Sequence, residues 1–294
     1  MDKKRGIVII GGQGLVGSRV VELLADSFTF ENQSRRTGFD ITDVQATQEM
    51  IVASQSSIVL HMAAKTDVEG CEQDRALGHR GEAWIANVEG VRNVVSACER
   101  SQKQLIYVST DFVFGNQVTP EGGFSEQDIP CPMNWYGQTK YEAEKIVQQM
   151  RTPWLIIRIA YPYRAKHPKR DFARTFLTLL QQEKPLRLVA DHIMNPTFID
   201  DIAFALDTLI QQQAAGIYHI AGSQPLSPYE AGLAIAEIFN LDRSLIEPIS
   251  RADYFTNRAP RPSSLFMNIE KTRHLGIRVR TFWEGLQEVK EHQN

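Results

Sequence analysis

The sequence is poor in the residues that build disulfide frameworks, metal sites and membrane spans. It has three cysteines, Cys71, Cys98 and Cys131, without C-x-x-C spacing; this odd number argues against a disulfide framework or zinc knuckle and favours a reducing compartment. Its seven histidines show no H-x-x-x-H spacing, so we expect no metal site. No apolar run approaches a membrane span, and the four apolar residues after MDKKRG are too few for a secretory signal. We therefore expect a cytoplasmic protein with no membrane partner.

A strong charge of either sign is also absent. The net charge is −3 over 294 residues and the pI is about 6.2, so no global basic field would attract nucleic acid. The hydrophobic share of 43% and the charged share of 23% are those of an ordinary globular protein. A chain of this length has ample core for one large domain or two lobes.

What the sequence does have, up to about residue 161, is a regular alternation of apolar strand-like runs and helix-like patterns. Strands that are continuous apolar runs indicate a parallel sheet with helices on both faces. We predict a doubly wound α/β fold of the Rossmann type. The expected strands are 6–10, 28–33, 56–64, 104–110 and 153–161, and expected helices include 18–27, 84–101 and 136–150.

Beyond about residue 161 the expected elements are shorter and the rhythm changes. We expect residues 1–160 to form the dinucleotide-binding domain and residues 161–294 to form mostly a smaller, interleaved substrate-binding lobe. Within the second segment, residues from about 186 to 221 are expected to return to the Rossmann sheet. The expected helices are 172–182, 198–212, 227–239 and 281–292, and the expected short strands are 186–191 and 216–222.

Three glycines separate the first expected strand from the first expected helix. Gly11, Gly14 and Gly17 give the pattern G-x-x-G-x-x-G. Glycine lets the backbone approach a pyrophosphate, and the amino end of the following helix then faces that negative charge. The position between strand and helix favours a dinucleotide site, and a tight turn without a ligand is the alternative.

The residues after the second expected strand bear on which dinucleotide binds. Glu31 lies twenty residues after Gly11, the offset of an acid that binds the ribose of NAD. Arg35 and Arg36 follow soon after, and two guanidinium groups here favour the 2′-phosphate of NADP. We favour NADPH as the cofactor, with NADH as the alternative. Asp40 can accept a hydrogen bond from the adenine amino group, although a turn aspartate needs no ligand.

Two tyrosines each precede a lysine by four residues in the stretch WYGQTKYEAEK. Tyr136 and Lys140 share one face of the expected helix with apolar residues, whereas Tyr141 and Lys145 share a face with polar ones. We expect the first pair to face the protein body and the second to face solvent. A lysine ammonium beside a phenol lowers the pKa of the phenol, which prepares tyrosine to exchange a proton with a carbonyl or alcohol oxygen.

A hydroxyl donor is expected beside this pair. Ser109 and Thr110 end the expected strand 104–110, and the carboxyl ends of parallel strands meet at the crevice where ligands bind. Either hydroxyl can therefore hydrogen-bond the oxygen that reacts with Tyr136.

Together, the stretches GGQGLVG, DITD, HMAA, VSTD and YGQTK resemble the extended short-chain dehydrogenase/reductase family. The resemblance implies an NADPH-dependent reductase of the 4-keto group of a nucleotide-diphosphate 6-deoxy sugar, in deoxysugar or rhamnose biosynthesis. It also implies at most a homodimer. Further stretches are similar to the dTDP-4-dehydrorhamnose reductases of that family and cover most of the chain: AAKTDVEGCE, YVSTDFVF, WYGQTK, NPTFIDDIA, GIYHIAG and RAPRPSS.

The resemblance also implies roles for particular residues. In the implied catalytic trio, Tyr136 gives the keto oxygen a proton, Lys140 tunes Tyr136, and Thr110 orients the carbonyl. The candidate substrate contacts are Asp111, Tyr161 and Asn195, although Asp111 can equally be a strand-end turn residue and a strand-to-helix turn at Asn195 needs no ligand. The implied cofactor contacts are Gly11, Gly14, Leu15, Val16, Gly17, Arg35, Arg36, Asp40, Ile41, Ala63, Ala64 and Lys140.

One match to the reductases and one departure from them bear on the reaction. Relatives that dehydrate nucleotide sugars carry Asp-Glu after the threonine, whereas Asp111 is followed here by Phe112, which disfavours dehydration. Where the reductases usually carry a tryptophan, this chain has Tyr161, which keeps a flat face, adds a polar tip and leaves the identity of the sugar open. A basic run follows that can meet a substrate diphosphate, although a solvated loop is the more common outcome: Arg164, Lys166, Lys169 and Arg170.

Two other functions fit the same residues. The regulatory subunit of methionine adenosyltransferase also resembles these reductases, so a non-catalytic NADP-binding subunit is one alternative. A nucleotide-sugar epimerase is the other, and it would keep the trio but show no net consumption of cofactor. The intact trio favours the reductase over the subunit.

Overall fold

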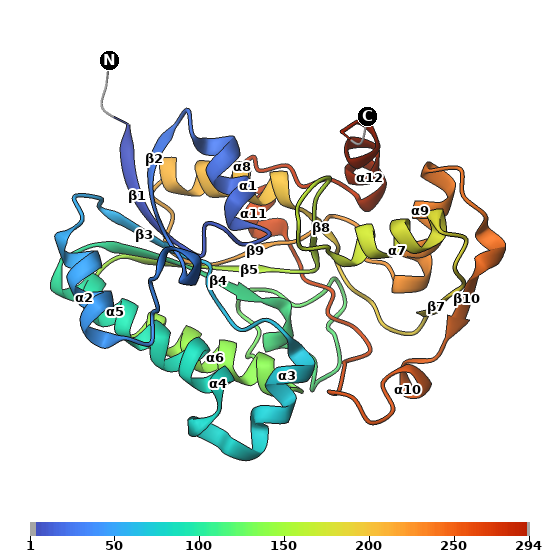
Figure 1. The fold of residues 1–294 in the computed structure, drawn as a ribbon, viewed down its shortest axis with the longest axis horizontal. Helices are drawn as coiled ribbons and strands as arrows, with labels where there is room; N and C mark the ends of the chain where they lie inside the picture. The colour runs from blue at the N-terminus through green and yellow to red at the C-terminus, as the bar shows by residue number, and fades with distance from the viewer. Residues whose placement is uncertain (1–3, 293–294) are drawn as a thin grey trace.

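The computed structural model describes residues 4–292, and its centre is a six-stranded sheet in which all neighbouring strands are parallel (Figure 1). The strand order is β2-β1-β3-β4-β5-β9, so the chain moves outwards from β1 in both directions and leaves a switch point between β1 and β3. The doubly wound prediction is confirmed. The strands are β1 Arg5–Ile10, β2 Phe28–Gln33, β3 Ile58–His61, β4 Gln104–Thr110, β5 Trp154–Ile159 and β9 Gly216–Ile220.

Helices cover both faces of this sheet (Figure 1). In β1, Ile7 and Ile9 pack into the core under α1 and α8, while Val8 and Ile10 pack into the core under α2, α5 and α6. Burial on both faces is the reason that β1 is apolar at every position from Ile7 to Ile10 rather than at alternate ones. The helices are α1 Gly17–Leu24, α2 Val44–Ala53, α5 Gly90–Arg100, α6 Trp135–Gln148 and α8 Ile199–Gln211.

The second lobe has a hydrophobic core of its own, built by α7 Phe172–Gln181, α9 Pro228–Ile238 and α12 Phe282–Glu291. The expected return of about 186–221 to the Rossmann sheet begins later than residue 186. β7 Leu186–Val189 pairs with β10 Ile246–Ile249 in a separate sheet, and only α8 and β9 rejoin the main sheet. The physical reason is that Leu186 and Leu188 pack into the core of the second lobe while Arg187 between them is exposed, so the apolar face of β7 is buried without the main sheet.

The expected helix 84–101 is interrupted by a π-helical turn, Ile85–Glu89, between α4 Glu82–Trp84 and α5. This turn directs Asn87 inwards. The Asn87 amide accepts from the Lys65 backbone N–H at 2.8 Å and donates to the Lys65 carbonyl and the Thr139 hydroxyl, each at 3.0 Å. It therefore links the end of β3 to α6. The remaining elements are α3 Val68–Gln73, β6 Pro162–Tyr163, β8 Thr197–Phe198, α10 Arg251–Tyr254 and α11 Glu270–Arg273.

Residues 4–292 contain neither a disulfide bond nor a cluster of side chains that could hold a metal ion. All three cysteines are free, and Cys71 and Cys98 are buried. Within this range no three His, Cys, Asp or Glu side chains are grouped so that they could hold a metal ion. No helix in the same range has the length and apolar character needed to cross a membrane.

Candidate active site

A cleft of about 610 Å³ lies at the carboxyl ends of β1, β3, β4 and β5, bordered by the start of the second lobe. The structure brings together most of the residues implied to act in catalysis or to contact the cofactor or substrate, but three of this set do not line the cleft: Asp40, Ile41 and Asn195. Those that do line it are Gly11, Gly14, Leu15, Val16, Gly17, Arg35, Arg36, Ala63, Ala64, Thr110, Asp111, Tyr136, Lys140 and Tyr161.

The glycine turn forms one end of the cleft, and two of its glycines are required by close contacts. Gly11 has a φ of +92°, and a Cβ there would lie 2.8 Å from the Ala63 nitrogen. A Cβ on Gly17 would lie 2.4 Å from the Gly11 carbonyl oxygen, so Gly17 allows α1 to pack against the end of β1. These are the two purposes that glycines serve in a dinucleotide-binding turn.

Glu31, whose position in the sequence is that of an acid that binds the ribose of NAD, makes other contacts in the structure. Glu31 lies within β2, paired with Val8, and accepts hydrogen bonds from the Ser54 and Ser56 hydroxyls at 2.8 and 2.6 Å. It fastens β2 to the segment before β3 and does not line the cleft.

Two arginines take the position at the end of β2. Arg35 and Arg36 open the short 3-10 turn Arg35–Thr37, and both line the cleft. The Arg35 side chain is 62% exposed, and its Nε lies 3.2 Å from Asp40. This end of the cleft is therefore positively charged and accessible.

Asp40 and Ile41 lie behind the cleft wall. One Asp40 oxygen accepts from the Thr42 backbone N–H and hydroxyl, both at 2.9 Å, and the other faces Arg35. Burial acts to raise the pKa of the Asp40 carboxyl, but these bonds outweigh it and lower the pKa. Ile41 packs against Gly90, where a Cβ would lie 2.6 Å from its side chain. Asp40 therefore positions Arg35, and Ile41 packs between the second and fifth helices.

The basic run of the second lobe meets the arginine end of the cleft rather than its far end. Lys169 and Arg170 line the cleft together with Arg35 and Arg36. Arg164 is buried and donates to the Ser18 hydroxyl at 3.0 Å, which fastens this loop to α1. Of the four cations in the run, only Lys166 is exposed and lies away from both the cleft and α1. The alternative of a solvated loop therefore holds for Lys166 but not for the other three cations.

Helix α6 carries the tyrosine and lysine, and a buried ion pair fixes it to the sheet. Arg158 in β5 donates to both oxygens of Glu144 in α6, at 3.0 and 2.7 Å, and both side chains are at most 1% exposed. Arg158 also lies 3.3 Å from Nε2 of His219 in β9. At the start of α6, the Asn134 side chain accepts from the Gly137 backbone N–H at 2.9 Å. The helix is thus held at both ends.

Tyr136 and Lys140 both face the protein body, as the helical spacing predicted, and are 8% and 3% exposed. Lys140 Nζ donates to the Val108 carbonyl at 2.8 Å and lies 4.1 Å from the centre of the Tyr107 ring. Burial lowers the pKa of Lys140 to about 7. The expected lowering of the Tyr136 pKa is not observed, because burial raises that pKa more than the Thr110 hydrogen bond lowers it.

Thr110 and Asp111 form a buried polar pair at the end of β4. The Thr110 hydroxyl donates to Asp111 Oδ1 at 2.9 Å and accepts from the Phe112 backbone N–H at 3.3 Å. Asp111 is 1% exposed, and burial raises the pKa of its carboxyl to about 7. Its Oδ2 is buried and has no hydrogen-bond partner within residues 4–292. A free acceptor therefore lies in the wall of the cleft.

Aromatic rings line the part of the cleft that faces the second lobe. The Phe112 ring centre lies 5.8 Å from that of Tyr136 and 6.1 Å from that of Tyr161. The Tyr161 hydroxyl lies 2.8 Å from Nε2 of His192. His192 was missed in the sequence, where an isolated histidine 31 positions along the chain gives no signal of this contact.

Asn195 is a structural link rather than part of the cleft wall. Its side-chain nitrogen donates to the Gly222 carbonyl at 2.8 Å, and its oxygen accepts from the Met267 backbone N–H at 3.0 Å. At 1% exposure and outside the cleft lining, it is not placed to contact a substrate. It joins three segments that are distant in the sequence.

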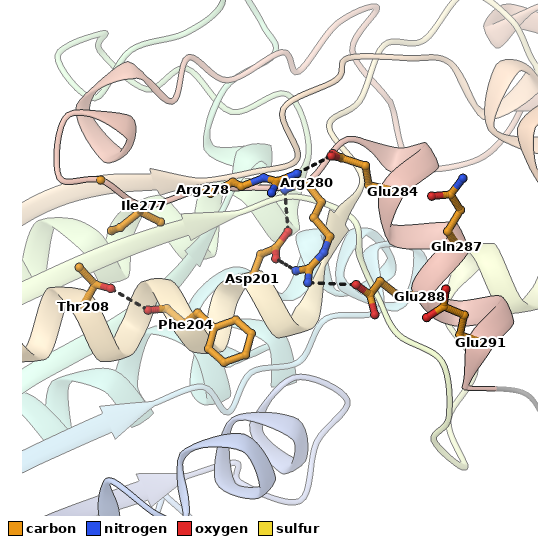
Figure 2. A pocket seen from close by; sticks show the side chains of 11 residues that line it. Asp201, Phe204, Thr208, Ile277, Arg278, Arg280, Glu284, Gln287, Glu288 and Glu291 are labelled. Carbon is orange, nitrogen blue, oxygen red and sulfur yellow. Dashed lines mark hydrogen bonds and ion pairs between the residues drawn. The ribbon is translucent and has the colours of Figure 1, made fainter.

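A second cavity, of about 490 Å³, lies between α8 and α12 (Figure 2). Its cations are already paired with neighbouring carboxylates. Arg280 bonds Asp201 and lies 3.2 Å from Glu288, and Arg278 lies 2.6 Å from Glu284. These pairs fasten α12 to α8, so we place no site here.

Comparison with known proteins gives a consistent picture over the whole chain. The family model described as RmlD substrate binding domain matches residues 4–294. A dTDP-4-dehydrorhamnose reductase of Aggregatibacter actinomycetemcomitans is 27% identical over 299 residues, covering 97% of this chain and 98% of the relative. Methionine adenosyltransferase 2 subunit beta of Mus musculus is 28% identical over 301 residues, covering 97% and 86%.

A solved structure is also similar along its full length. The crystal structure of dTDP-4-dehydrorhamnose reductase from Bacillus anthracis in complex with NADP superposes with a TM-score of 0.89 at 27% identity. The similarity covers 99% of this chain and 100% of the other. The resemblance to the extended short-chain dehydrogenase/reductase family is thus confirmed, second lobe included.

Proposed function

Because the chain belongs to the RmlD substrate binding domain family, we propose that it is an NADPH-dependent reductase of a nucleotide-linked 4-keto-6-deoxy sugar, of the dTDP-4-dehydrorhamnose type. The observation that carries the proposal is the single cleft that joins the glycine turn to Thr110, Tyr136 and Lys140. Similarity over the full length to proteins named dTDP-4-dehydrorhamnose reductase supports the substrate class.

The glycine and arginine end of the cleft fits NADPH. Gly14 lines the cleft, and its missing side chain lets the backbone of the turn approach a pyrophosphate. Arg35 and Arg36 supply guanidinium groups for a 2′-phosphate, and Glu31 is unavailable to a ribose. When bound, NADPH supplies the hydride that the keto carbon accepts.

Tyr136 is the proposed proton donor to the keto oxygen. Burial raises the pKa of its phenol, so the group is protonated at neutral pH, which is the form that a reduction needs. Lys140, whose pKa burial lowers to about 7, is proposed to contact the nicotinamide ribose. In its charged form Lys140 stabilises the phenolate that remains on Tyr136 after the proton has moved.

The neighbours of Tyr136 favour reduction over dehydration. Thr110 is proposed to orient the carbonyl, for which its hydroxyl must exchange its bond to Asp111 for one to the keto oxygen. The free Oδ2 of Asp111 is proposed to accept from a sugar hydroxyl. Phe112 presents a ring to Tyr136 where dehydrating relatives would carry a carboxylate.

The test is to mix the protein with NADPH and dTDP-4-dehydrorhamnose and to follow the loss of nicotinamide absorbance. We expect turnover by the wild type and about 10²- to 10⁴-fold less by Tyr136→Phe, the usual contribution of a general acid. Tyr141→Phe, on the adjacent face of α6, is the matched control and should keep the wild-type rate. Equal rates for wild type and Tyr136→Phe would remove Tyr136 from the chemistry.

A second candidate function is a non-catalytic NADP-binding regulatory subunit. The observation that favours it is the 28% identity to methionine adenosyltransferase 2 subunit beta, which is as high as the identity to the reductase relatives. It predicts NADPH binding without oxidation of NADPH, together with a stoichiometric enzyme partner in a pull-down.

A further inference from the structure

Tyr161 is held in an unusual backbone conformation at the cleft wall. Tyr161 is the first residue of the second lobe. Its φ of +39° is in the left-handed region that bulky residues rarely adopt. Thr197, which is fully buried, donates from its backbone N–H to the Tyr161 carbonyl at 3.3 Å and from its hydroxyl to the Ala160 carbonyl at 2.6 Å. These bonds hold the backbone at Tyr161 in this conformation, and a backbone held in a rarely used conformation at a cleft wall motivates a functional hypothesis.

The hydrogen bonds of His192 determine which way the Tyr161 proton points. Nδ1 of His192 lies 2.7 Å from the Pro262 carbonyl oxygen, which can only accept, so Nδ1 carries a proton. His192 is 2% exposed, and burial lowers its pKa to about 4, so the ring is neutral at neutral pH. In this tautomer Nε2 is an acceptor, and the Tyr161 hydroxyl, 2.8 Å away, donates to it.

A phenol that gives its proton to a histidine can only accept from a ligand. The Tyr161 pKa is raised by burial and by the charge of Asp111, so the proton stays on Tyr161. The free Oδ2 of Asp111, when ionised, is a second acceptor in the same cleft. Phe112 lies between this wall and Tyr136, with ring centres 6.1 Å from Tyr161 and 5.8 Å from Tyr136.

We propose that Tyr161, oriented by His192, accepts a hydrogen bond from the sugar hydroxyl next to the reacting carbon and so selects keto sugars that carry this hydroxyl. Tyr161 is the residue that contacts the substrate, and His192 is a positioning residue behind it. The inference rests on the proposed reductase function for the identity of the ligand. An indole at this position would donate rather than accept, so the tyrosine reverses the polarity of the contact.

The experiment measures binding, so that it does not depend on turnover. Calorimetry on the NADP⁺-loaded protein would give the Kd of dTDP-rhamnose and of its 3-deoxy analogue. We expect the wild type to prefer dTDP-rhamnose by about tenfold, the usual size of one hydrogen bond, and Tyr161→Phe to bind both ligands equally. His192→Leu should lose the preference as well.

His192→Gln is the rescuing variant, because its amide nitrogen can donate to Pro262 and its amide oxygen can accept from Tyr161. This variant should keep the preference for dTDP-rhamnose. If His192→Gln lost the preference as His192→Leu does, His192 would act through its shape and not through the acceptor atom Nε2. Two results would overturn the proposal. One is a wild type that binds both ligands equally, and the other is a Tyr161→Phe variant that loses the same factor of affinity for both ligands and so keeps the preference. A preserved preference without NADPH oxidation would contradict the reductase function alone.

Discussion

The two ends of the cleft differ in how their charged side chains are held. At the end formed by Arg35 and Arg36, which we call the phosphate end, charged side chains are exposed and loosely paired. At the end formed by Thr110, Asp111, Tyr136 and Lys140, here the carbonyl end, they are buried and bonded to neighbours. Arg35 is 62% exposed with its ion-pair partner at 3.2 Å, whereas Lys140 is 3% exposed and bonded to the β4 backbone at 2.8 Å.

The difference reflects what each end has to do. Exposed cations attract a phosphate without a large desolvation cost and release it readily, and their effect is screened by salt. Buried groups in fixed positions interact strongly with charge that develops during a reaction. In the proposed function, exposed charge would bind the cofactor, and the chemistry would take place among buried groups that are bonded to their neighbours. Four experiments test the contrast between the two ends, and the largest expected effect comes first.

The largest effect is expected beneath the carbonyl end, at the ion pair of Arg158 and Glu144. Arg158→Met leaves Glu144 as an unpaired buried charge, and we expect the free energy of unfolding to fall by about 3–5 kcal/mol. Arg273→Met removes the exposed pair with Glu270 and should cost less than about 1 kcal/mol. Urea unfolding of both variants is the measurement, and similar losses would contradict the contrast between buried and exposed charge.

The next effect concerns the pH dependence of stability. The pKa of Asp111 is raised to about 7 in the folded protein from 3.8, so between these values the folded state keeps a proton that the unfolded chain has released. Stability should therefore fall as the pH rises through this window, by up to about 4 kcal/mol, and the loss is complete above pH 7.

Asp111→Asn removes this titration. The free energy of unfolding of the variant, relative to that of the wild type, should therefore increase from about pH 4 to pH 7. Urea unfolding at several pH values is the measurement. The exposed Asp26→Asn is the control and should follow the wild type. Parallel curves for Asp111→Asn and wild type would show that the carboxyl is not held neutral by burial.

At the phosphate end we expect an effect on cofactor choice. Replacing Arg35 and Arg36 together by alanine should raise the Kd of NADPH by about tenfold or more, since each guanidinium can make a charge-assisted hydrogen bond. The Kd of NADH should change little. Titration of nicotinamide fluorescence at low and high salt is the measurement, with Lys166→Ala, whose side chain is outside the cleft, as the control. Equal weakening of both cofactors would refute the assignment.

The smallest effect is expected at the second tyrosine–lysine pair. Lys145 is 43% exposed, bonds Glu142 at 2.6 Å and lies 5.0 Å from the centre of the Tyr141 ring. Lys145→Ala should change the free energy of unfolding by less than about 0.5 kcal/mol and leave NADPH oxidation unchanged. If it impaired turnover as much as Lys140→Ala, the distinction between the two faces of α6 would be lost.

Much of the fold could be predicted because it depends on local pattern. Apolar runs buried on both faces identify the strands, and the spacing of Tyr136 and Lys140 identifies the inner face of α6. The pairing of 186–189 with 246–249 had no local signal, because charged residues also occur within strands of the main sheet, as Arg158 does in β5.

What could not be predicted depends on contacts between distant segments. The direction of the Tyr136 pKa shift is set by burial, which the helix alone does not reveal. The engagement of Glu31 with Ser54 and Ser56 follows from the register of neighbouring elements. The bond from Tyr161 to His192, and from His192 to Pro262, joins three separate stretches of chain.

The position of β9 has a consequence for how the protein is made. β5 pairs with β9 from Leu155 to Ile159, yet β9 is synthesised only after α7, β7 and α8. A chain ending at residue 160 would leave an apolar strand as an open sheet edge, a known route to aggregation. The sheet can therefore be completed only after Ile220 has been synthesised, and until then the β5 edge is open to wrong pairing.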